Sequence, residues 1–387
     1  MYFYVRKYNC LPELLNMSET VERAETAPFP LIDIEGPPAA RGRSYGRQAG
    51  ERIQRSLSIY REILARDGME WSKAREISRA IIPNVEARYP GSVEEIRGIA
   101  AGAECTVEDI FAINARTELL YGHGSSDESD PDGCTGAIAM AEVTRSGHLL
   151  HGQNWDWKDD CADSSIVLRI HPDKGLPMLA FVEAGLLARC GFNSAGIGLT
   201  GNHLKCEHDA GRSGTPIPFV RRQVLEHATF AEAARAVMTS RLGFSNNMMI
   251  SDAGNEAINL EVTPVETFWV APEEGLLVHA NHFVAPAARA KLRDLSLLSN
   301  TDSLYRDVRV RKHLSKAAPA ITIETFQTAF QDRYGSPRAV CRSLFTGDNG
   351  LPSATTVATI LMDTTLRKMW VAPRPYGPHR YTEYSLE

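Results

Sequence analysis

A polar segment at residues 122–133 divides this 387-residue chain into two parts with different hydrophobic periodicity. The segment reads GHGSSDESDPDG and contains no apolar side chain, so we expect an exposed loop. Before it, apolar residues recur every three or four positions, as in amphipathic helices. After it, short apolar or alternating runs separated by turn residues predict strands. We therefore expect an α-rich part, residues 1–133, and an α+β part, residues 134–387.

The expected elements follow from this change of period. Helices are predicted over residues 53–64, 72–87 with a break near Pro83, 93–101, 106–120, 218–239, 301–314 and 323–330. Strands are predicted over residues 134–143, 148–155, 165–170, 178–183, 196–201, 248–251, 257–262, 267–270, 357–362 and 368–372. Hydrophobic residues make up 43% of the chain, so it can bury a large core.

The composition argues against several classes of protein. The chain has 42 basic and 48 acidic residues, whereas a nucleic-acid-binding protein needs a basic surface, so we expect no nucleic-acid partner. No window holds the ~18 uncharged apolar residues that a membrane-spanning helix needs. Residues 1–17 lack the apolar segment of a secretory signal. Seven cysteines without a C-x-x-C pair indicate reduced thiols, and we expect a cytoplasmic protein.

Cys134 differs from the other cysteines because it follows Gly133 at the end of the polar loop and begins a predicted strand. A glycine adopts strained backbone conformations readily and leaves its carbonyl open to close approach. The Cys134 thiol can therefore attack the Gly133 carbonyl, shift the acyl group from nitrogen to sulfur, and let water release Cys134 as a new N-terminus. An α-amine has a pKa of about 7.7–8.0 and is suited to act as base for the adjacent thiol.

A second motif, GQNWDW at Gly152–Trp157, begins eighteen residues after Cys134. This spacing predicts a strand, a turn near residues 145–147 and an antiparallel return strand, which would bring Asp156 close to Cys134. A carboxylate there can hold the α-amine or orient the thiol. The competing interpretation is a simple acidic turn, because further aspartates follow at positions 159, 160 and 163.

The pair of motifs, DGCT at Asp132–Thr135 and GQNWDW, resembles the acyl-coenzyme A:isopenicillin N acyltransferase family of N-terminal-nucleophile hydrolases. Weaker similarities lie at Gly42–Gly46, Asn114–Glu118, Asn246–Asp252, Asn259–Pro264, His279–His282 and Ser303–Arg306. The chain is also similar, at a distance, to bile-salt hydrolases and penicillin V acylases, which lack a long helical pro-segment. The resemblance implies a four-layer αββα sandwich, with residues 1–133 as a helical pro-segment and residues 134–387 as the catalytic chain.

The resemblance further implies that an inactive precursor cuts itself between Gly133 and Cys134. Cys134 would then be the nucleophile and its freed amine the base. Asp156 is expected to position that amine. The two cleavage products are expected to remain associated.

Two more site residues are carried over from the family. Asn247 is expected to hold the oxyanion, with the adjacent Asn246 as an alternative, because a preorganised amide donor stabilises developing negative charge. Arg306 is the expected site arginine, and Arg309 and Arg311 on the same predicted helix are alternatives.

Other chemistries have weaker support in the sequence. His279 and His282 do not combine with the remaining histidines in a ligand spacing, so we expect no metal and no cofactor. The G-x-G-x-x-G pattern at Gly196–Gly201 is not followed by a helical pattern, which argues against a dinucleotide site. A conventional protease pairing Cys134 with either histidine, and a catalytically silent family member, are the rival hypotheses.

These observations predict an enzyme that cleaves the C–N amide bond of a small N-acyl substrate through a thioester on Cys134. The thioester can pass its acyl group to water or to an amine acceptor, so an amidohydrolase and an acyltransferase are both open. The excess of water and the lack of a coenzyme A phosphate motif favour the hydrolase. The expected partners are the amide substrate and, as an open possibility, a second copy of the chain; no membrane is expected.

Overall fold

Two β-sheets stacked face to face form the centre of the chain in a computed structural model, which describes residues 27–122, 133–209, 214–346 and 353–387. Residues 1–17 and residues 123–132 of the predicted loop lie outside the described residues. The eight-stranded sheet has the order β1 (Leu31–Gly36), β4 (Ser165–Pro172), β5 (Met178–Glu183), β6 (Cys190–Asn193), β7 (Ile197–His203), β8 (Asn246–Asp252), β9 (Glu256–Val262) and β10 (Thr267–Val270). The six-stranded sheet has the order β11 (Leu276–His279), β2 (Gly133–Ala139), β3 (Leu150–Trp157), β12 (Thr355–Asp363), β13 (Lys368–Pro373) and β14 (Thr382–Ser385).

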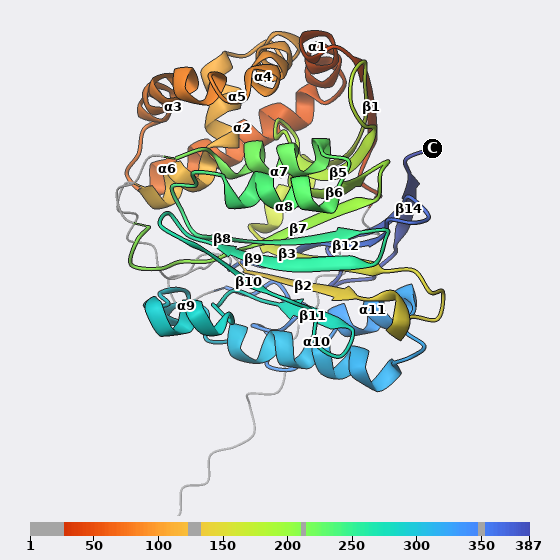
Figure 1. The fold of residues 1–387 in the computed structure, drawn as a ribbon. Coiled ribbons are helices and arrows are strands. Elements are labelled where there is room, and N and C mark those ends of the chain that lie inside the picture. Colours follow the sequence, from red (N-terminus) through yellow and green to blue (C-terminus); the bar gives the residue numbers. More distant parts are fainter. Residues whose placement is uncertain (1–26, 123–132, 210–213, 347–352) are drawn as a thin grey trace, which may run out of the picture.

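Helices cover the outer face of each sheet (Figure 1). Those over the eight-stranded sheet are α1 (Pro38–Gln48), α2 (Gly50–Arg66), α3 (Trp71–Glu86), α4 (Pro90–Gly102), α5 (Val107–Asn114), α6 (Arg116–Gly122), α7 (Ile217–Glu226) and α8 (Phe230–Met238). Below the six-stranded sheet lie α10 (Ser303–Ala317) and α11 (Ile323–Phe330), with the short α9 (Pro286–Lys291) beside them. The predicted α+β, four-layer αββα architecture is confirmed.

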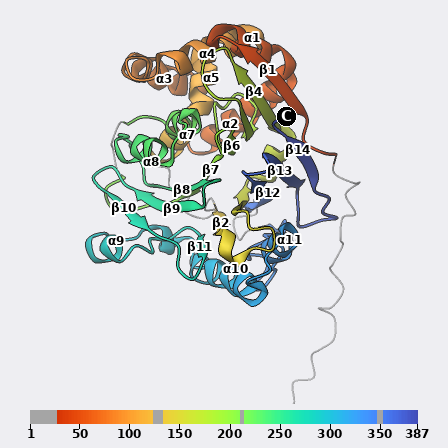
Figure 2. The same ribbon diagram turned by 45° about the vertical axis from the view of Figure 1, so that its right-hand side comes forward.

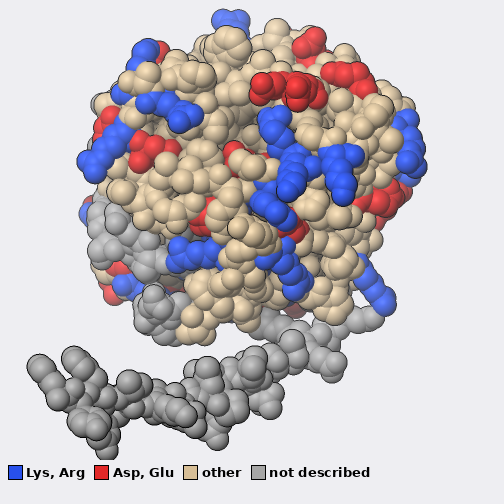
Figure 3. Space-filling view, turned by 90° about the horizontal axis from the view of Figure 1, so that it is seen from below, with Lys and Arg blue, Asp and Glu red and all other residues tan. Residues whose placement is uncertain are grey.

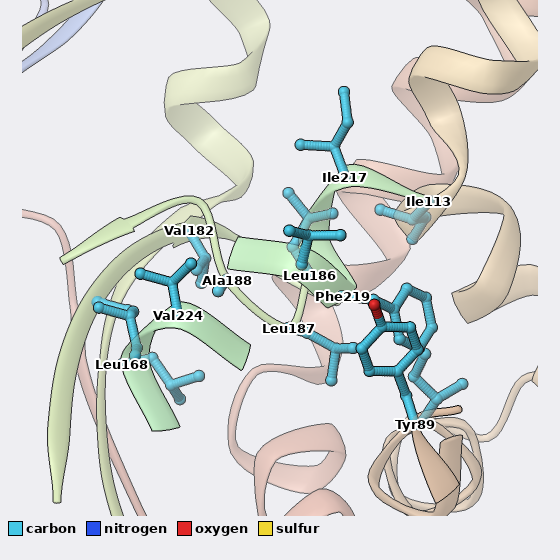
Figure 4. Packing of buried hydrophobic residues seen from close by; sticks show 14 of the residues in the cluster. Tyr89, Ile113, Leu168, Val182, Leu186, Leu187, Ala188, Ile217, Phe219 and Val224 are labelled. Carbon is cyan, nitrogen blue, oxygen red and sulfur yellow. The ribbon is translucent and has the colours of Figure 1, made fainter. Parts of the chain in front are cut away.

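Apolar cores between the layers hold the fold together. Between the upper helices and the eight-stranded sheet, Val224 of α7 lies beside Leu168 and Val182 of the strands (Figure 4). Between the sheets, Trp155 of β3 meets Phe181 of β5 edge to face with ring centroids 5.8 Å apart. Each such apolar side chain removed from water stabilises the fold by about 1.5–3 kcal/mol. Because both faces of the sheets are covered, strands such as β5 are buried at every residue.

The residues before position 123 are part of this core. β1 pairs in parallel with β4, so a strand from the predicted pro-segment forms the edge of the eight-stranded sheet. The last strand, β14, lies near β1 (Figure 2), and the Tyr384 hydroxyl donates to the Phe29 carbonyl at 2.6 Å. The helices of residues 38–122 share one layer with α7 and α8, and residues on both sides of position 133 contribute to one apolar cluster.

Several predicted boundaries were wrong. The strand expected over 134–143 ends at Ala139, where a short 3-10 turn follows. The helix expected over 106–120 is divided at Ala115 into α5 and α6. The helix expected over 218–239 is also two helices, because the Thr229 side chain accepts a hydrogen bond from the Glu232 amide and starts α8 anew.

Pro83 does not break α3, which continues to Glu86. A proline inside a helix removes its own N–H donor and crowds the carbonyl four residues before it. The next turn of α3 still forms, because the Ala87 amide donates to the Pro83 carbonyl at 3.1 Å. The sequence did not predict six of the elements: the strands β1, β6, β11 and β14 and the helices α1 and α9. The four strands have six residues or fewer, which leaves a weak period-2 signal. Two of them, β1 and β11, also pair with strands more than 100 positions away.

Basic side chains are not spread evenly over the surface. Lys and Arg side chains gather on part of the face seen from below, where α9, α10 and α11 lie (Figure 3). Among the described residues, no helix is both long and apolar enough to cross a membrane.

Candidate active site

Cys134 is the second residue of β2 and is buried, with 1% of its surface exposed. β2 and β3 are antiparallel neighbours, and their register places Cys134 opposite Trp155 and Gly133 opposite Asp156. The hairpin that the spacing predicted is therefore present. Asp156 belongs to a strand and not to an acidic turn.

The Asp156 carboxylate is enclosed beside Gly133. Its Oδ1 atom accepts a hydrogen bond from Thr356 Oγ1 at 2.6 Å. Within the described residues its Oδ2 atom accepts none, although Arg342 Nε is 3.3 Å away and Arg306 Nη1 is 4.0 Å away. Burial raises the pKa of Asp156, and the charges of Arg342 and Arg306 oppose that shift.

Arg306 of α10 donates hydrogen bonds to the segment that contains Cys134. Its Nη1 donates to the Cys134 carbonyl at 2.7 Å and to Thr135 Oγ1 at 2.9 Å. Its Nε donates to Asp302 Oδ2 at 2.7 Å, which fixes the plane of the fully buried guanidinium. Of the three candidate arginines of α10, Arg306 is the one that the structure brings to Cys134.

The other two arginines are engaged elsewhere. Arg309 pairs with Asp332, and Arg311 donates to the Glu273 carbonyl.

Asn281 also forms a hydrogen bond with the backbone of Cys134. The Cys134 amide donates to Asn281 Oδ1 at 2.8 Å, and Arg306 Nη2 donates to the same oxygen at 2.8 Å. Asn281 Nδ2 in turn donates to the His203 carbonyl at 2.9 Å. Neither Asn281 nor Arg342 was predicted as a site residue from the sequence. Asn281 lies inside the segment His279–His282 whose family similarity was noted, which was an available signal; Arg342 had none.

The two candidate oxyanion residues face opposite ways, as neighbours in a strand must. Asn246 lines a cavity beside Cys134, where its Oδ1 accepts from Arg221 at 3.1 Å and its Nδ2 donates to the Asn202 carbonyl at 2.9 Å. Asn247 does not line this cavity, and its side chain donates to Asn259 Oδ1. The structure thus places Asn246, and not Asn247, in the lining of the cavity that Cys134 also lines.

The histidines make other contacts. His279 Nε2 lies 3.0 Å from Glu261 Oε1, and His282 Nδ1 lies 2.8 Å from Ser303 Oγ. Across the described ranges neither histidine forms a hydrogen bond with Cys134, and no group of three or more His, Cys, Asp or Glu side chains could hold a metal ion. This geometry does not supply the base of a conventional cysteine–histidine protease.

The arrangement suits chemistry at the Gly133–Cys134 peptide bond. The amide and carbonyl of Cys134 are fixed by Asn281 and Arg306, and Gly133 lies against Asp156. The Asp156 oxygen that accepts no hydrogen bond in the described structure lies against Gly133, one residue before the amine that cleavage would free. Nucleophile, base and a carboxylate partner would then come together in one buried site.

Comparison with known proteins gives two consistent results. The profile of the family described as "Acyl-coenzyme A:6-aminopenicillanic acid acyl-transferase" matches residues 143–373. The chain is 30% identical over 355 residues to the 40 kDa form of acyl-coenzyme A:6-aminopenicillanic-acid-acyltransferase from Emericella nidulans, covering 90% of this chain and 93% of that protein.

Two solved structures are similar at lower identity. A variant of conjugated bile acid hydrolase from Clostridium perfringens has a TM-score of 0.45 and 15% identity, over 65% of this chain and 92% of that one. Penicillin V acylase from Agrobacterium tumefaciens has a TM-score of 0.36 and 13% identity, over 62% of this chain and 83% of that one.

Proposed function

The chain belongs to the acyl-coenzyme A:6-aminopenicillanic acid acyltransferase family, and from this premise we propose that it is a self-processing enzyme that cleaves amide bonds through Cys134. The observation that carries the proposal is the setting of Cys134. It is buried at the start of β2, its backbone is held by Asn281 and Arg306, and Asp156 lies across the ladder from Gly133.

The first reaction is the cleavage of the chain. The Cys134 sulfur attacks the carbonyl carbon of Gly133, the C–N bond breaks, and the proton lost by the thiol passes to the new amine. The thioester between Gly133 and Cys134 is then hydrolysed by water, which leaves a carboxylate on Gly133 and a free thiol on Cys134. Residues 1–133 and 134–387 stay associated because they share one core.

The second reaction uses the product of the first. The freed α-amine takes the thiol proton, and the thiolate attacks the carbonyl of the amide substrate. A side-chain amide stabilises the oxyanion, and Asn246 or Asn247 is proposed to supply it. The ammonium of Cys134, held by Asp156, gives its proton to the leaving amine, and water hydrolyses the thioester.

An intact mass spectrum of the purified protein tests the proposal. We expect two chains, residues 1–133 and residues 134–387, from the wild-type protein and one uncut chain from the Cys134→Ala variant. The Cys190→Ala variant is the matched control, since Cys190 is equally buried but lies on β6, and it should be cut normally. An uncut wild-type chain that nevertheless turns over amides would overturn the mechanism.

Acyl transfer to an amine is the second candidate, and the name of the Emericella relative favours it. We retain the hydrolase as the main proposal because water competes for the same thioester at vast excess. Incubation of the cut enzyme with acyl-coenzyme A and 6-aminopenicillanic acid distinguishes the two. An acyl-amine product that forms faster than the free acid would identify the acyltransferase.

We also propose that the protein works in a reducing compartment, the cytoplasm. The six cysteines within the described ranges are free thiols, at positions 105, 134, 161, 190, 206 and 341. Formation of a homo-oligomer is an open possibility. The mass of the native cut protein in solution decides it.

A further inference from the structure

A small cavity beside the Cys134 sulfur is lined by three arginines, Arg116, Arg189 and Arg221. Its volume of about 30 Å³ is enough for one or two water molecules or a group of similar size. Three guanidinium groups around one buried space require an explanation, because a buried cation is costly unless it is paired.

Arg116 has its partner, since its Nη2 lies 2.7 Å from the buried carboxylate of Glu183. Arg189 and Arg221 are 4% and 6% exposed, and neither makes an ion pair with a carboxylate anywhere in the described chain. The Nε atoms of both are buried without a hydrogen-bond partner. Positive charge in the cavity is therefore incompletely compensated by the protein.

Arg189 is fixed next to the nucleophile. Its guanidinium stacks on the Trp155 ring, 3.9 Å from the ring centroid. Its Nη2 lies 3.8 Å from Cys134 Sγ. A carboxylate bound to Arg189 at the usual 2.7–2.9 Å or so would lie within about 7 Å of the sulfur, and hence a few bonds from a carbonyl under attack.

Arg221 reaches the same cavity from α7. A Cβ atom at position 201 would lie 2.6 Å from Arg221 Nη2, so the glycine there leaves the room that this guanidinium occupies. Burial, and next the charge of Arg189, lowers the pKa of Arg221 to about 10.

The other titratable groups near the cavity do not cancel this charge. Burial lowers the pKa of His203 to about 4, so the imidazole is neutral at pH 7. Burial raises the pKa of Glu118 to about 7, although Arg116 and Arg221 oppose the shift, so this carboxyl is only partly ionised at pH 7.

We propose that Arg189 and Arg221 form an anion-binding subsite, and that the amide substrate carries a carboxylate a few bonds from its scissile carbonyl. The inference rests on the proposed function, because it takes Cys134 as the group that attacks the substrate. Two guanidinium forks in a buried space suit the planar, two-oxygen geometry of a carboxylate.

Two alkylating reagents of the same size test the subsite without knowledge of the substrate. Iodoacetate and iodoacetamide each transfer a CH₂ group to a thiolate with loss of iodide, and they differ in carrying a carboxylate or a neutral amide. We expect Cys134 of the cut wild-type protein to be alkylated faster by iodoacetate, with saturation as its concentration rises. Mass mapping of the Cys134 peptide gives both rates.

Variants separate the subsite from the general charge of the protein. Arg221→Gln should lower the rate ratio of iodoacetate to iodoacetamide by about 10-fold, as expected for loss of a hydrogen bond to a charged group. Arg221→Lys should restore part of it. Arg309→Gln removes the same charge from α10, away from the cavity, and should leave the ratio unchanged.

The outcomes distinguish this inference from the proposed function. A correctly cut protein with no preference for iodoacetate, or one in which neither reagent reaches Cys134, overturns the subsite alone. An Arg221→Gln variant with the wild-type ratio also overturns it. A wild-type chain that is uncut in its mass spectrum overturns the proposed function instead.

Discussion

Asp156 lies directly across the β2–β3 ladder from Gly133, and one of its two carboxylate oxygens receives no hydrogen bond from the described residues. A buried acceptor in this state lacks the hydrogen bonds it would make in water, which is costly unless a further donor arrives. The ammonium group that the proposed cleavage at Cys134 would release is a candidate for such a donor. The unfilled acceptor of Asp156 thus suits the group that the proposed self-processing would create.

The Asp156→Asn variant should therefore lose amide turnover. We expect kcat to fall by about 100-fold or more, because the ammonium at Cys134 loses the charge that holds it in place. KM should change much less, and steady-state kinetics on the cut protein measure both. Equal loss of kcat in Asp332→Asn, whose carboxylate pairs with Arg309, would show a general structural effect instead.

Gly133→Ala should slow self-cleavage by about 10-fold or more. A Cβ atom there would lie 2.7 Å from Arg342 Cζ and 2.8 Å from Asp156 Oδ2, so the peptide bond must move out of its position. The same clash should destabilise the precursor by about 1–3 kcal/mol. Gly50→Ala is the control because nothing lies within 4 Å of its added Cβ, and a time course of chain lengths on a denaturing gel compares the two.

Arg306→Lys should impair cleavage despite keeping the charge. A lysine ammonium cannot reproduce the fork that joins the Cys134 carbonyl, Thr135, Asn281 and Asp302. We expect cleavage to slow by about 10-fold and the free energy of unfolding to fall by as much as about 3 kcal/mol. Arg309→Lys, on the same helix, should behave as wild type in both cleavage and urea unfolding.

The two asparagines of β8 give a direct comparison. If oxyanion stabilisation follows the cavity lining, Asn246→Ala should lower kcat by about 100-fold or more, while Asn247→Ala mainly lowers stability. The reverse order of kcat values would assign the role to Asn247, as the sequence resemblance implies. Both variants should be measured on fully cut protein so that slow processing does not mimic slow turnover.

Glu118 gives a prediction about pH. Burial raises its pKa from 4.5 to about 7, so the folded chain binds a proton that the unfolded chain loses above pH 4.5. The stability contributed by this group is complete below pH 4.5 and is lost as the pH rises through 7. Glu118→Gln should then stabilise the chain above pH 7, by up to about 3 kcal/mol, and have little effect at pH 4.5.

Urea unfolding at several pH values measures this difference. Glu256→Gln, at an exposed position of β9, should show no such pH-dependent gain. A Glu118→Gln variant whose stability follows the wild type at every pH would contradict the prediction.

The layered fold and the pairing of Asp156 with Gly133 were accessible from the sequence for a physical reason. Strand period, turn residues and an eighteen-residue spacing are local quantities, and a hairpin converts local spacing into spatial contact. The confirmed resemblance supplied Arg306 in the same way, through a motif that can be counted along the chain.

Other parts of the site have no local signature. Asn281, Arg342, Arg189 and Arg221 are single polar residues whose roles depend on partners 50 or more positions away. Whether Asn246 or Asn247 lines the cavity depends on which face of β8 meets it. A one-residue shift in register would exchange the two side chains. β1 was missed because its parallel partner, β4, is far along the chain.

The edge strand β1 gives the proposed cleavage a consequence for refolding. In the uncut chain β1 and α1–α6 are tethered to the strands and helices that they pack against, so assembly of the core is a unimolecular process. After cleavage at Gly133 the same core becomes the interface of a heterodimer, and its midpoint of unfolding depends on protein concentration. The covalent link would thus act as an intramolecular chaperone that is used once. The cut enzyme would then stay folded because it unfolds slowly. Dilution out of denaturant would not restore its structure.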